Sequence, residues 1–225
     1  MTWYHLGHTA RAVAAATAWL VKRLREPGPG TGTLVLAGGR TPVALYERLA
    51  QAPIPWERLV LVPSDERCLP EGAPERNDVM LARALLSRLP VKPGGFVPIP
   101  AHKGPAVAAA EFEKVAMGVP PIRAAILGLG EDGHTASLFP GDEALEARGW
   151  AAPVWRAPKP PPERVTLTLE ALGRADDVLF LALGTAKEEA LRRWMAGEAL
   201  PAARVHPRKS LAVFTDRDPA FSSQR

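Results

Sequence analysis

The chain has few of the features that mark a secreted or membrane-bound protein. Its 225 residues include one cysteine, Cys68, so no disulfide can form within the chain, and a lone thiol suits a reducing compartment. We expect Cys68 to pack as a small apolar side chain. No apolar run approaches the about 18 residues of a membrane helix, and residues 1–7 lack a signal-peptide pattern. These absences predict a cytoplasmic protein with no membrane partner.

Two further classes of partner find no support in the charge pattern. The net charge is only +4, and the 28 basic residues are spread along the chain, so no nucleic-acid partner is expected. His5, His8 and His102 have no companions at zinc-like spacing, so no metal is expected. A modest positive balance would still help to attract a small anion.

Amide side chains are also scarce, whereas prolines are abundant. The chain has one asparagine, Asn77, two glutamines and 24 prolines. Few thermolabile amides and many loop prolines are typical of a thermophile. A GC-rich genome would enrich proline as well, so both explanations stay open.

The composition is that of an ordinary globular protein. With 47% hydrophobic and 23% charged residues, the chain can bury a sizeable core, and we expect one α/β domain over residues 1–225. Short apolar runs alternate with segments of helical pattern. This order predicts a Rossmann-like parallel sheet with helices on both faces.

The individual elements follow from apolar runs, caps and prolines. The predicted strands are 33–37, 59–62, 124–127, 165–169, 178–183 and 211–214. The predicted helices are 9–24, 42–50, 77–88, 106–117, 170–175 and 186–196. Thr9 and Thr41 are the expected N-caps, and Pro42 should occupy the first position of its helix. The stretches 90–105 and 151–162 are rich in proline and are expected to be loops.

The most informative segment, 127–141, directly follows the predicted strand 124–127. It places three glycines around Asp132 and His134, and those glycines are Gly128, Gly130 and Gly133. Glycine permits tight turns and close approach of the backbone to a ligand. An aspartate two residues before a histidine can orient the imidazole for general-base catalysis. The plainer alternative is a glycine-rich turn with a solvated histidine.

Glycines and charges also follow three other predicted strands. These segments are Gly38-Gly39-Arg40-Thr41, Asp65-Glu66-Arg67 and Gly184-Thr185-Ala186-Lys187. Since ligands of open parallel sheets bind beyond the carboxyl ends of the strands, we expect these segments to meet. Arg40 at a helix start can clamp a phosphate, and Lys187 in a first helical turn opposes the dipole unless an anion compensates. The alternatives are a capped helix start and solvated surface charges.

Together these segments resemble the 6-phosphogluconolactonase family, within the larger glucosamine-6-phosphate isomerase and lactonase group. The matching pieces, in the family's order, are 38–42 with Leu45 and Tyr46, 65–67, Asn77 with Met80, 128–141, 162–167 and 184–187. The resemblance runs from about residue 33 to the end of the chain. There are two small departures, since Ala37 and Arg76 stand where the family often has serine. Either could alter a hydrogen bond to the ligand.

The resemblance implies hydrolysis of 6-phospho-D-glucono-1,5-lactone to 6-phospho-D-gluconate in the oxidative pentose phosphate pathway, without metal or organic cofactor. It makes His134 the general base, with Asp132 and Asp65 orienting the imidazole or the sugar. The candidate phosphate ligands are Gly38, Gly39, Arg40, Thr41, Arg67 and Lys187. Supporting roles fall to Asn77, Gly130, Gly133 and Arg164. The expected partner is a phosphorylated sugar lactone, and the expected assembly is a monomer or weak homodimer.

Two alternatives belong to other classes. The related glucosamine-6-phosphate deaminases carry a glutamate shortly after the histidine, where this chain has Phe139 and no carboxylate before Asp142. This difference favours the lactonase. Some transcriptional regulators use the same fold to sense sugar phosphates, but they add a DNA-binding helical unit. We expect the sheet to begin by residue 33, which leaves no room for such a unit before it.

Overall fold

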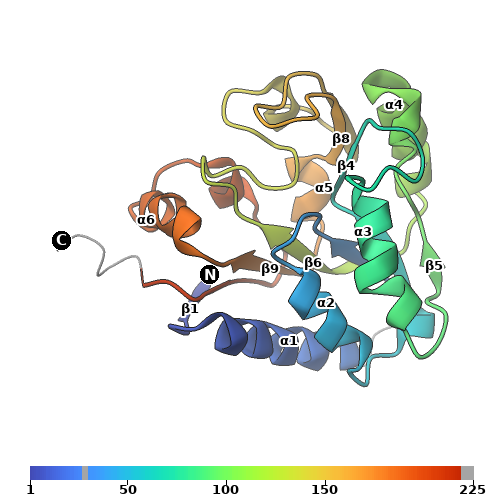
Figure 1. Ribbon diagram of the computed structural model, residues 1–225. Coiled ribbons are helices and arrows are strands. Elements are labelled where there is room, and N and C mark those ends of the chain that lie inside the picture. The colour runs from blue at the N-terminus through green and yellow to red at the C-terminus, as the bar shows by residue number, and fades with distance from the viewer. Residues whose placement is uncertain (27–29, 219–225) are drawn as a thin grey trace.

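The computed structural model describes residues 1–26 and 30–218, and a seven-stranded sheet forms the centre of that part (Figure 1). In spatial order its strands are β1 (Thr2–His5), β10 (Ser210–Thr215), β9 (Asp177–Ala182), β6 (Ile122–Gly128), β2 (Gly32–Leu36), β3 (Leu59–Pro63) and β5 (Gly95–Phe96). All six pairings are parallel. After β1, the chain builds outward from β2 to β5 and then places β6 on the other side of β2. This reversal makes the β2–β6 boundary a topological switch point.

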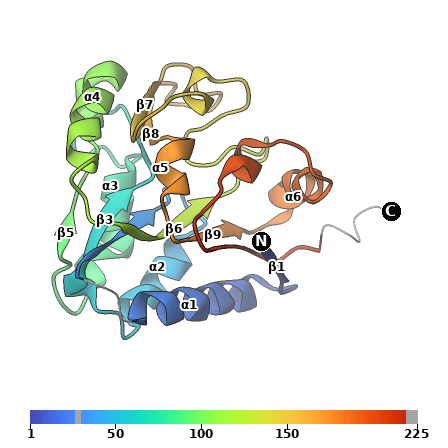
Figure 2. The same ribbon diagram turned by 180° about the vertical axis from the view of Figure 1, so that it is seen from behind.

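Helices cover both faces of this sheet, as Figures 1 and 2 show from opposite sides. One face packs against α1 (Thr9–Arg25), α2 (Val43–Ala50) and α3 (Asn77–Ala84), and the other against α4 (Pro105–Ala116), α5 (Leu169–Gly173) and α6 (Glu188–Met195). Successive side chains of a strand point to opposite faces. Accordingly, Leu34 and Leu36 lie in the core beneath α1, α2 and α3, whereas Val35 lies in the core beneath α4, α5 and α6. The predicted fold class is confirmed.

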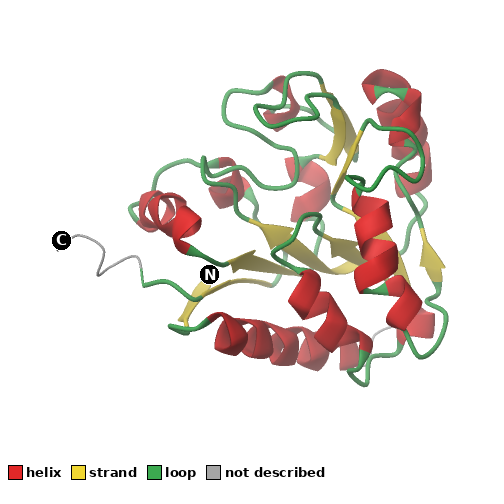
Figure 3. Ribbon diagram, viewed as in Figure 1, coloured by secondary structure: helices red, strands yellow, loops and turns green. Residues whose placement is uncertain are grey.

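A second, smaller sheet lies beside the carboxyl end of the first (Figure 3). It has three antiparallel strands, in the order β4 (Asp65–Arg67), β8 (Arg164–Leu167) and β7 (Ala151–Val154). The chain leaves β3 at Pro63 and almost at once pairs with β8, with Asp65 opposite Thr166. Residues 65–67, which the sequence places directly after a predicted strand, thus form a strand of their own. The prediction of a loop over 151–162 was wrong in part, since β7 begins there.

Both predicted N-caps were wrong. His8 caps α1 by accepting a hydrogen bond from the Ala10 N–H at 3.2 Å, and the Thr9 hydroxyl instead donates to Asp216 at 2.5 Å. Helix α2 begins at Val43, after a turn closed by a 3.3 Å bond from the Val43 N–H to the Arg40 carbonyl. Thr41 and Pro42 belong to that turn, so Pro42 and not Thr41 occupies the N-cap position of α2.

Other boundaries differ where the apolar pattern is weak or short. The sheet begins with β1 at Thr2, not near residue 33, and β5 lies in a predicted loop. The predicted helix 77–88 ends at Ala84 and continues as a 3-10 turn over Leu86–Arg88. Further 3-10 turns lie at Trp56–Arg58, Ala101–Lys103, Glu143–Leu145, Thr185–Lys187 and Pro201–Arg204. Among the described helices, none combines the length and apolar character that crossing a membrane requires.

Candidate active site

A cleft of about 320 Å³ opens at the carboxyl ends of β2, β3 and β6, at the switch point of the sheet. It collects most of the residues predicted from the sequence. Its lining includes Gly38, Gly39, Thr41, Asp65, Arg67, Asn77, Gly130, His134, Arg164 and Lys187. Three predicted residues, Arg40, Asp132 and Gly133, do not line it. Asp132 and Gly133 lie in the loop that carries His134, whereas Arg40 is exposed at the start of α2.

His134 and Asp132 form a close pair in the loop after β6. His134 Nδ1 lies 2.5 Å from Asp132 Oδ1, and the His134 backbone N–H donates to the same oxygen at 3.1 Å. Burial raises the pKa of Asp132, but the hydrogen bonds from His134 outweigh it and lower the pKa from 3.8 to about 2. The carboxylate therefore accepts the Nδ1 proton. Nε2 is left without a hydrogen-bond partner among the described residues and free to take a proton.

Two glycines make this loop geometry possible. A Cβ on Gly130 would lie 2.0 Å from His134 Nδ1, so any other residue would displace the imidazole. Gly133 has φ +88°, and its Cβ would also meet the side chain of Leu200 at 2.9 Å. Phe139 packs on the imidazole, with ring centroids 4.5 Å apart. The imidazole of His134 thus packs between the backbone at Gly130 and the ring of Phe139.

Asp65 lies in the same cleft but is bound differently. Its carboxylate accepts from the Ser64 hydroxyl at 2.9 Å and from the Ser137 hydroxyl at 2.7 Å, and only 5% of the residue is exposed. The Asn77 side chain donates to the Asp65 carbonyl at 2.8 Å. No hydrogen bond joins Asp65 to His134 in the described part of the chain. Of the two predicted orienting carboxylates, only Asp132 contacts the imidazole.

Beneath Asp65 lies a buried charged cluster that the sequence did not reveal. Glu66 is completely buried and accepts the backbone N–H groups of Arg67, Asn77 and Asp78 at 2.7–2.8 Å. Burial raises the pKa of Glu66 to about 7, although these hydrogen bonds act in the opposite direction. Arg76, 3.9 Å from Glu66, binds the Asp78 carboxylate at 2.6 Å. Of the two departures from the family pattern, Arg76 thus contacts protein groups and does not line the cleft, whereas Ala37 does line it.

This cluster fixes Asn77 against the turn after β2. A Cβ on Gly38 would lie 2.1 Å from Asn77 Oδ1, so only glycine fits there. Gly39 has φ +84°, a conformation that other residues rarely adopt. Asn77 Oδ1 is buried without a hydrogen-bond partner among the described residues. The turn therefore lies close to α3, and its backbone borders the cleft.

Four cationic side chains line the cleft, and they are not equivalent. Arg164 is buried, and its guanidinium donates to the Pro161 carbonyl at 3.1 Å and to the Lys159 carbonyl at 2.7 Å. Arg67 donates to the Glu75 carbonyl, and its buried Nε has no partner among the described residues. Lys187 is the last residue of a 3-10 turn that directly precedes α6. It therefore lies just before the helix and not in its first turn, where the sequence predicted it. Burial lowers the pKa of Lys187.

Sequence reasoning missed the fourth cation, Lys159. It lies in the proline-rich segment 158–162, which was interpreted only as a loop. A single cation within a run of prolines, directly before the motif that carries Arg164, was the available signal. Ser64 and Ser137 were also missed, because a lone serine has no distinctive pattern.

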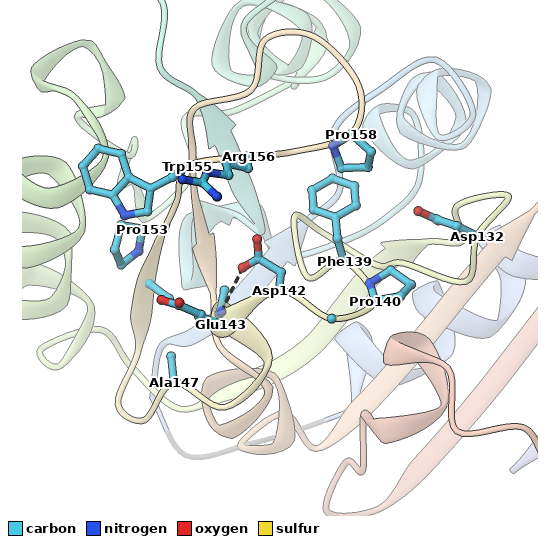
Figure 4. Close-up of a pocket in the computed structure, with 13 residues that line it drawn as sticks. Asp132, Phe139, Pro140, Asp142, Glu143, Ala147, Pro153, Trp155, Arg156 and Pro158 are labelled. Carbon is cyan, nitrogen blue, oxygen red and sulfur yellow. Dashed lines mark hydrogen bonds between the residues drawn. The ribbon is translucent and has the colours of Figure 1, made fainter.

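A larger hollow of about 850 Å³ has Asp132 in its lining (Figure 4). Asp132 borders one end, and Trp155 and Arg156 lie at the other. Its floor includes Asp142, whose carboxylate caps a short turn by accepting from the Ala144 N–H at 2.9 Å. It lacks the glycine turns and the lysines of the smaller cleft, and we place the candidate active site in the cleft. The described residues contain no cluster of three or more side chains suited to a metal.

Comparison with known proteins identifies the family of this chain. The sequence pattern of the family described as glucosamine-6-phosphate isomerases/6-phosphogluconolactonase matches residues 7–214. The chain belongs to this family. The predicted family resemblance is thereby confirmed.

Individual relatives are similar over most of their length. A 6-phosphogluconolactonase from Synechocystis is 34% identical over 92% of this chain and 90% of its own. One from Streptomyces coelicolor is 37% identical over 81% of this chain and 78% of its own. The crystal structure of the Thermotoga maritima 6-phosphogluconolactonase is 30% identical, with a TM-score of 0.83 over 95% of this chain and 97% of that one.

Proposed function

We propose that this protein is a 6-phosphogluconolactonase, a carboxylic ester hydrolase that converts 6-phospho-D-glucono-1,5-lactone to 6-phospho-D-gluconate. The observation that carries the proposal is the Asp132–His134 pair at a cleft lined by cations. Relatives at 34% and 37% identity that carry this name support it. The reaction needs a base near an ester carbonyl and a cationic site for a phosphate, and the cleft offers both.

The base is His134. Asp132 accepts the Nδ1 proton, so Nε2 presents its lone pair and can deprotonate a water molecule that attacks the lactone carbonyl. The same nitrogen then returns the proton to the ring oxygen as the ester bond breaks. Backbone N–H groups of the glycine turns that border the cleft are candidates for stabilising the oxyanion. Asp132 stays ionised throughout, because its lowered pKa lies far below neutral pH.

Lys187 and Arg67 are the proposed cationic ligands of the phosphate. Both line the cleft, as does the turn formed by Gly38 and Gly39. Thr41 and Asn77 also line it as further polar contacts. Arg40 would need to rotate inward from its exposed position to join them. Arg164 has a positioning role, since its Nε and Nη2 donate to backbone carbonyls and its Nη1 lies 3.5 Å from the Ser137 hydroxyl.

Phe139 argues against the deaminase alternative. It is 3% exposed and packs on the His134 ring, at the place where the deaminases carry a glutamate. An apolar side chain there cannot transfer a proton. We therefore expect the protein to open the phosphorylated lactone and to release no ammonia from glucosamine 6-phosphate.

The test compares the two reactions on the purified protein at one pH. Lactone opening is corrected for spontaneous hydrolysis measured without enzyme. Ammonia release at a rate comparable to lactone opening would reverse the proposal. The expected assembly remains a monomer or weak homodimer, and sedimentation at several concentrations checks it.

A further inference from the structure

The proline-rich segment 158–162 holds Lys159 at the mouth of the cleft. The Ala157 N–H donates to the Pro162 carbonyl at 2.9 Å and closes the base of the segment. From below, the buried Arg164 guanidinium binds the Lys159 carbonyl at 2.7 Å. Proline restricts the backbone further, because its ring fixes φ. The backbone of Lys159 is therefore fixed, while its side chain remains 55% exposed.

Lys159 and Lys187 act on each other electrostatically. Each of the two lines the cleft, and the charge of Lys159 contributes to lowering the pKa of Lys187, after burial. Two ammonium groups that line one cleft repel, which is unfavourable unless an anion compensates. The arrangement is that of an anion site formed from two segments far apart in the sequence.

Glu131 supplies a counter-ion to both lysines. Its Oε1 lies 3.4 Å from Lys159 Nζ, and its charge raises the pKa of Lys187. Glu131 is 55% exposed, and no other ion pair involving it is found among the described residues. An exposed ion pair of this kind contributes little and is readily exchanged for water. A phosphate dianion carries about twice the charge of a carboxylate and offers more acceptor oxygens.

We propose that Lys159 joins Lys187 in binding the phosphate of the substrate, and that Glu131 is an internal counter-ion displaced when phosphate binds. The identity of the phosphate compound rests on the proposed function, but the anion site itself does not. Lys159 then sets specificity, because a lactone without a phosphate gains nothing from it. Glu131 limits affinity, because the incoming phosphate must replace it.

The first experiment measures equilibrium binding of inorganic phosphate by calorimetry, which needs no turnover. We expect Lys159→Ala to weaken binding about threefold to tenfold, and Lys159→Arg to restore most of the loss. Glu131→Gln should tighten binding about twofold to fivefold, and this gain should shrink in the Lys159→Ala background. The matched control is the Lys103–Glu111 pair, 2.7 Å apart and also exposed but not lining the cleft. Lys103→Ala and Glu111→Gln should change nothing.

The second experiment measures steady-state kinetics of the same variants. Lys159→Ala should raise KM for the phosphorylated lactone with kcat almost unchanged, and should not affect hydrolysis of glucono-1,5-lactone. Phosphate binding equal to wild type in Lys159→Ala, or an equal loss in Lys103→Ala, overturns the proposal. If the wild type binds phosphate with the expected pattern but opens no lactone, the proposed function fails and the anion site stands. If the wild type opens the lactone but Lys159→Ala binds phosphate as tightly as the wild type, the anion site at Lys159 fails and the proposed function stands.

Discussion

The candidate site and its surroundings contain a partly exposed carboxylate, Asp132, and two buried ones, Asp65 and Glu66. The environments of Asp132 and of the buried pair are opposite in kind. Asp132 is partly open, with 38% of its side chain exposed, and its main partner is the imidazole of His134. Asp65 and Glu66 are buried, and their oxygens bind serine hydroxyls and backbone N–H groups. Burial raises the pKa of Glu66 to about 7, whereas the hydrogen bonds from His134 lower that of Asp132 to about 2.

The difference separates chemistry from support. An ionised carboxylate on one nitrogen of an imidazole fixes the tautomer and leaves the other nitrogen free to exchange a proton. A buried carboxylate whose oxygens accept several hydrogen bonds from the protein ties together the segments that donate to it. Glu66 joins β4 to the start of α3 in this way. The comparison predicts that variants of the open pair lose rate and that variants of the buried cluster lose stability.

The largest effect is expected for His134→Ala. If His134 is the general base, kcat should fall about 10²–10⁴-fold with a smaller change in KM, because the residue acts in the transition state. Lactone hydrolysis, corrected for the spontaneous reaction, measures both kcat and KM.

His102→Ala is the matched control for this variant. His102 Nδ1 lies 3.1 Å from Glu71 Oε1, and His102 does not line the cleft. Its substitution should therefore leave kcat unchanged. Circular dichroism must show that both variants are folded. A folded His134→Ala protein that keeps more than about a tenth of wild-type kcat, against the loss expected of a general base, would move the base elsewhere. Asp65 would then be the next candidate.

A pair of isosteric variants tests the contrast directly. Asp132→Asn should lower kcat by about 10²-fold with little change in stability, because it removes the charge that orients and supports the imidazole. Asp65→Asn should instead lower the free energy of unfolding by about 1–3 kcal/mol, because an amide donor replaces one of the two oxygens that accept buried hydroxyls. Steady-state kinetics and urea unfolding on each variant separate the two effects. Equal losses of kcat at unchanged stability would break the contrast.

The smallest effect concerns the pH dependence of stability. Since the pKa of Glu66 is raised from 4.5 to about 7, its neutral form is favoured in the folded state. The stability that this adds is fully present below about pH 4.5 and is lost as pH rises through 7. Between pH 5 and 9 the free energy of unfolding should therefore fall by about 1–3 kcal/mol through this group.

Glu66→Gln tests this dependence, since glutamine cannot ionise. The variant should be less stable at pH 5, because one oxygen acceptor is replaced by a donor, and its stability should vary less between pH 5 and 9. Urea unfolding at several pH values gives both quantities. An unchanged pH slope in the variant would show that Glu66 remains ionised over this range in the folded protein.

The parts of the site that could be predicted are those governed by neighbours in the sequence. Asp132 and His134 are two residues apart, and the glycines around them permit only a tight turn, so their contact follows from local geometry. The gathering of segments at one end of the sheet follows from the alternation of strands and helices. The turn after β2 was predicted for the same reason, but its cap was not, because a short turn competed with the helix for the same positions.

The amino-acid sequence by itself determined the parallel sheet, the family and the loop that holds His134, because periodicity and short-range hydrogen bonds depend on residues close in the chain. The tertiary structure alone decided which charges are free. Asp65 meets Ser137 from 72 residues away, and Arg164 is occupied by carbonyls of a proline segment, whereas Arg40 faces solvent. Lys159 reaches the cleft only because that segment folds over it. Burial and distant partners set the role of each charge, and both arise from packing.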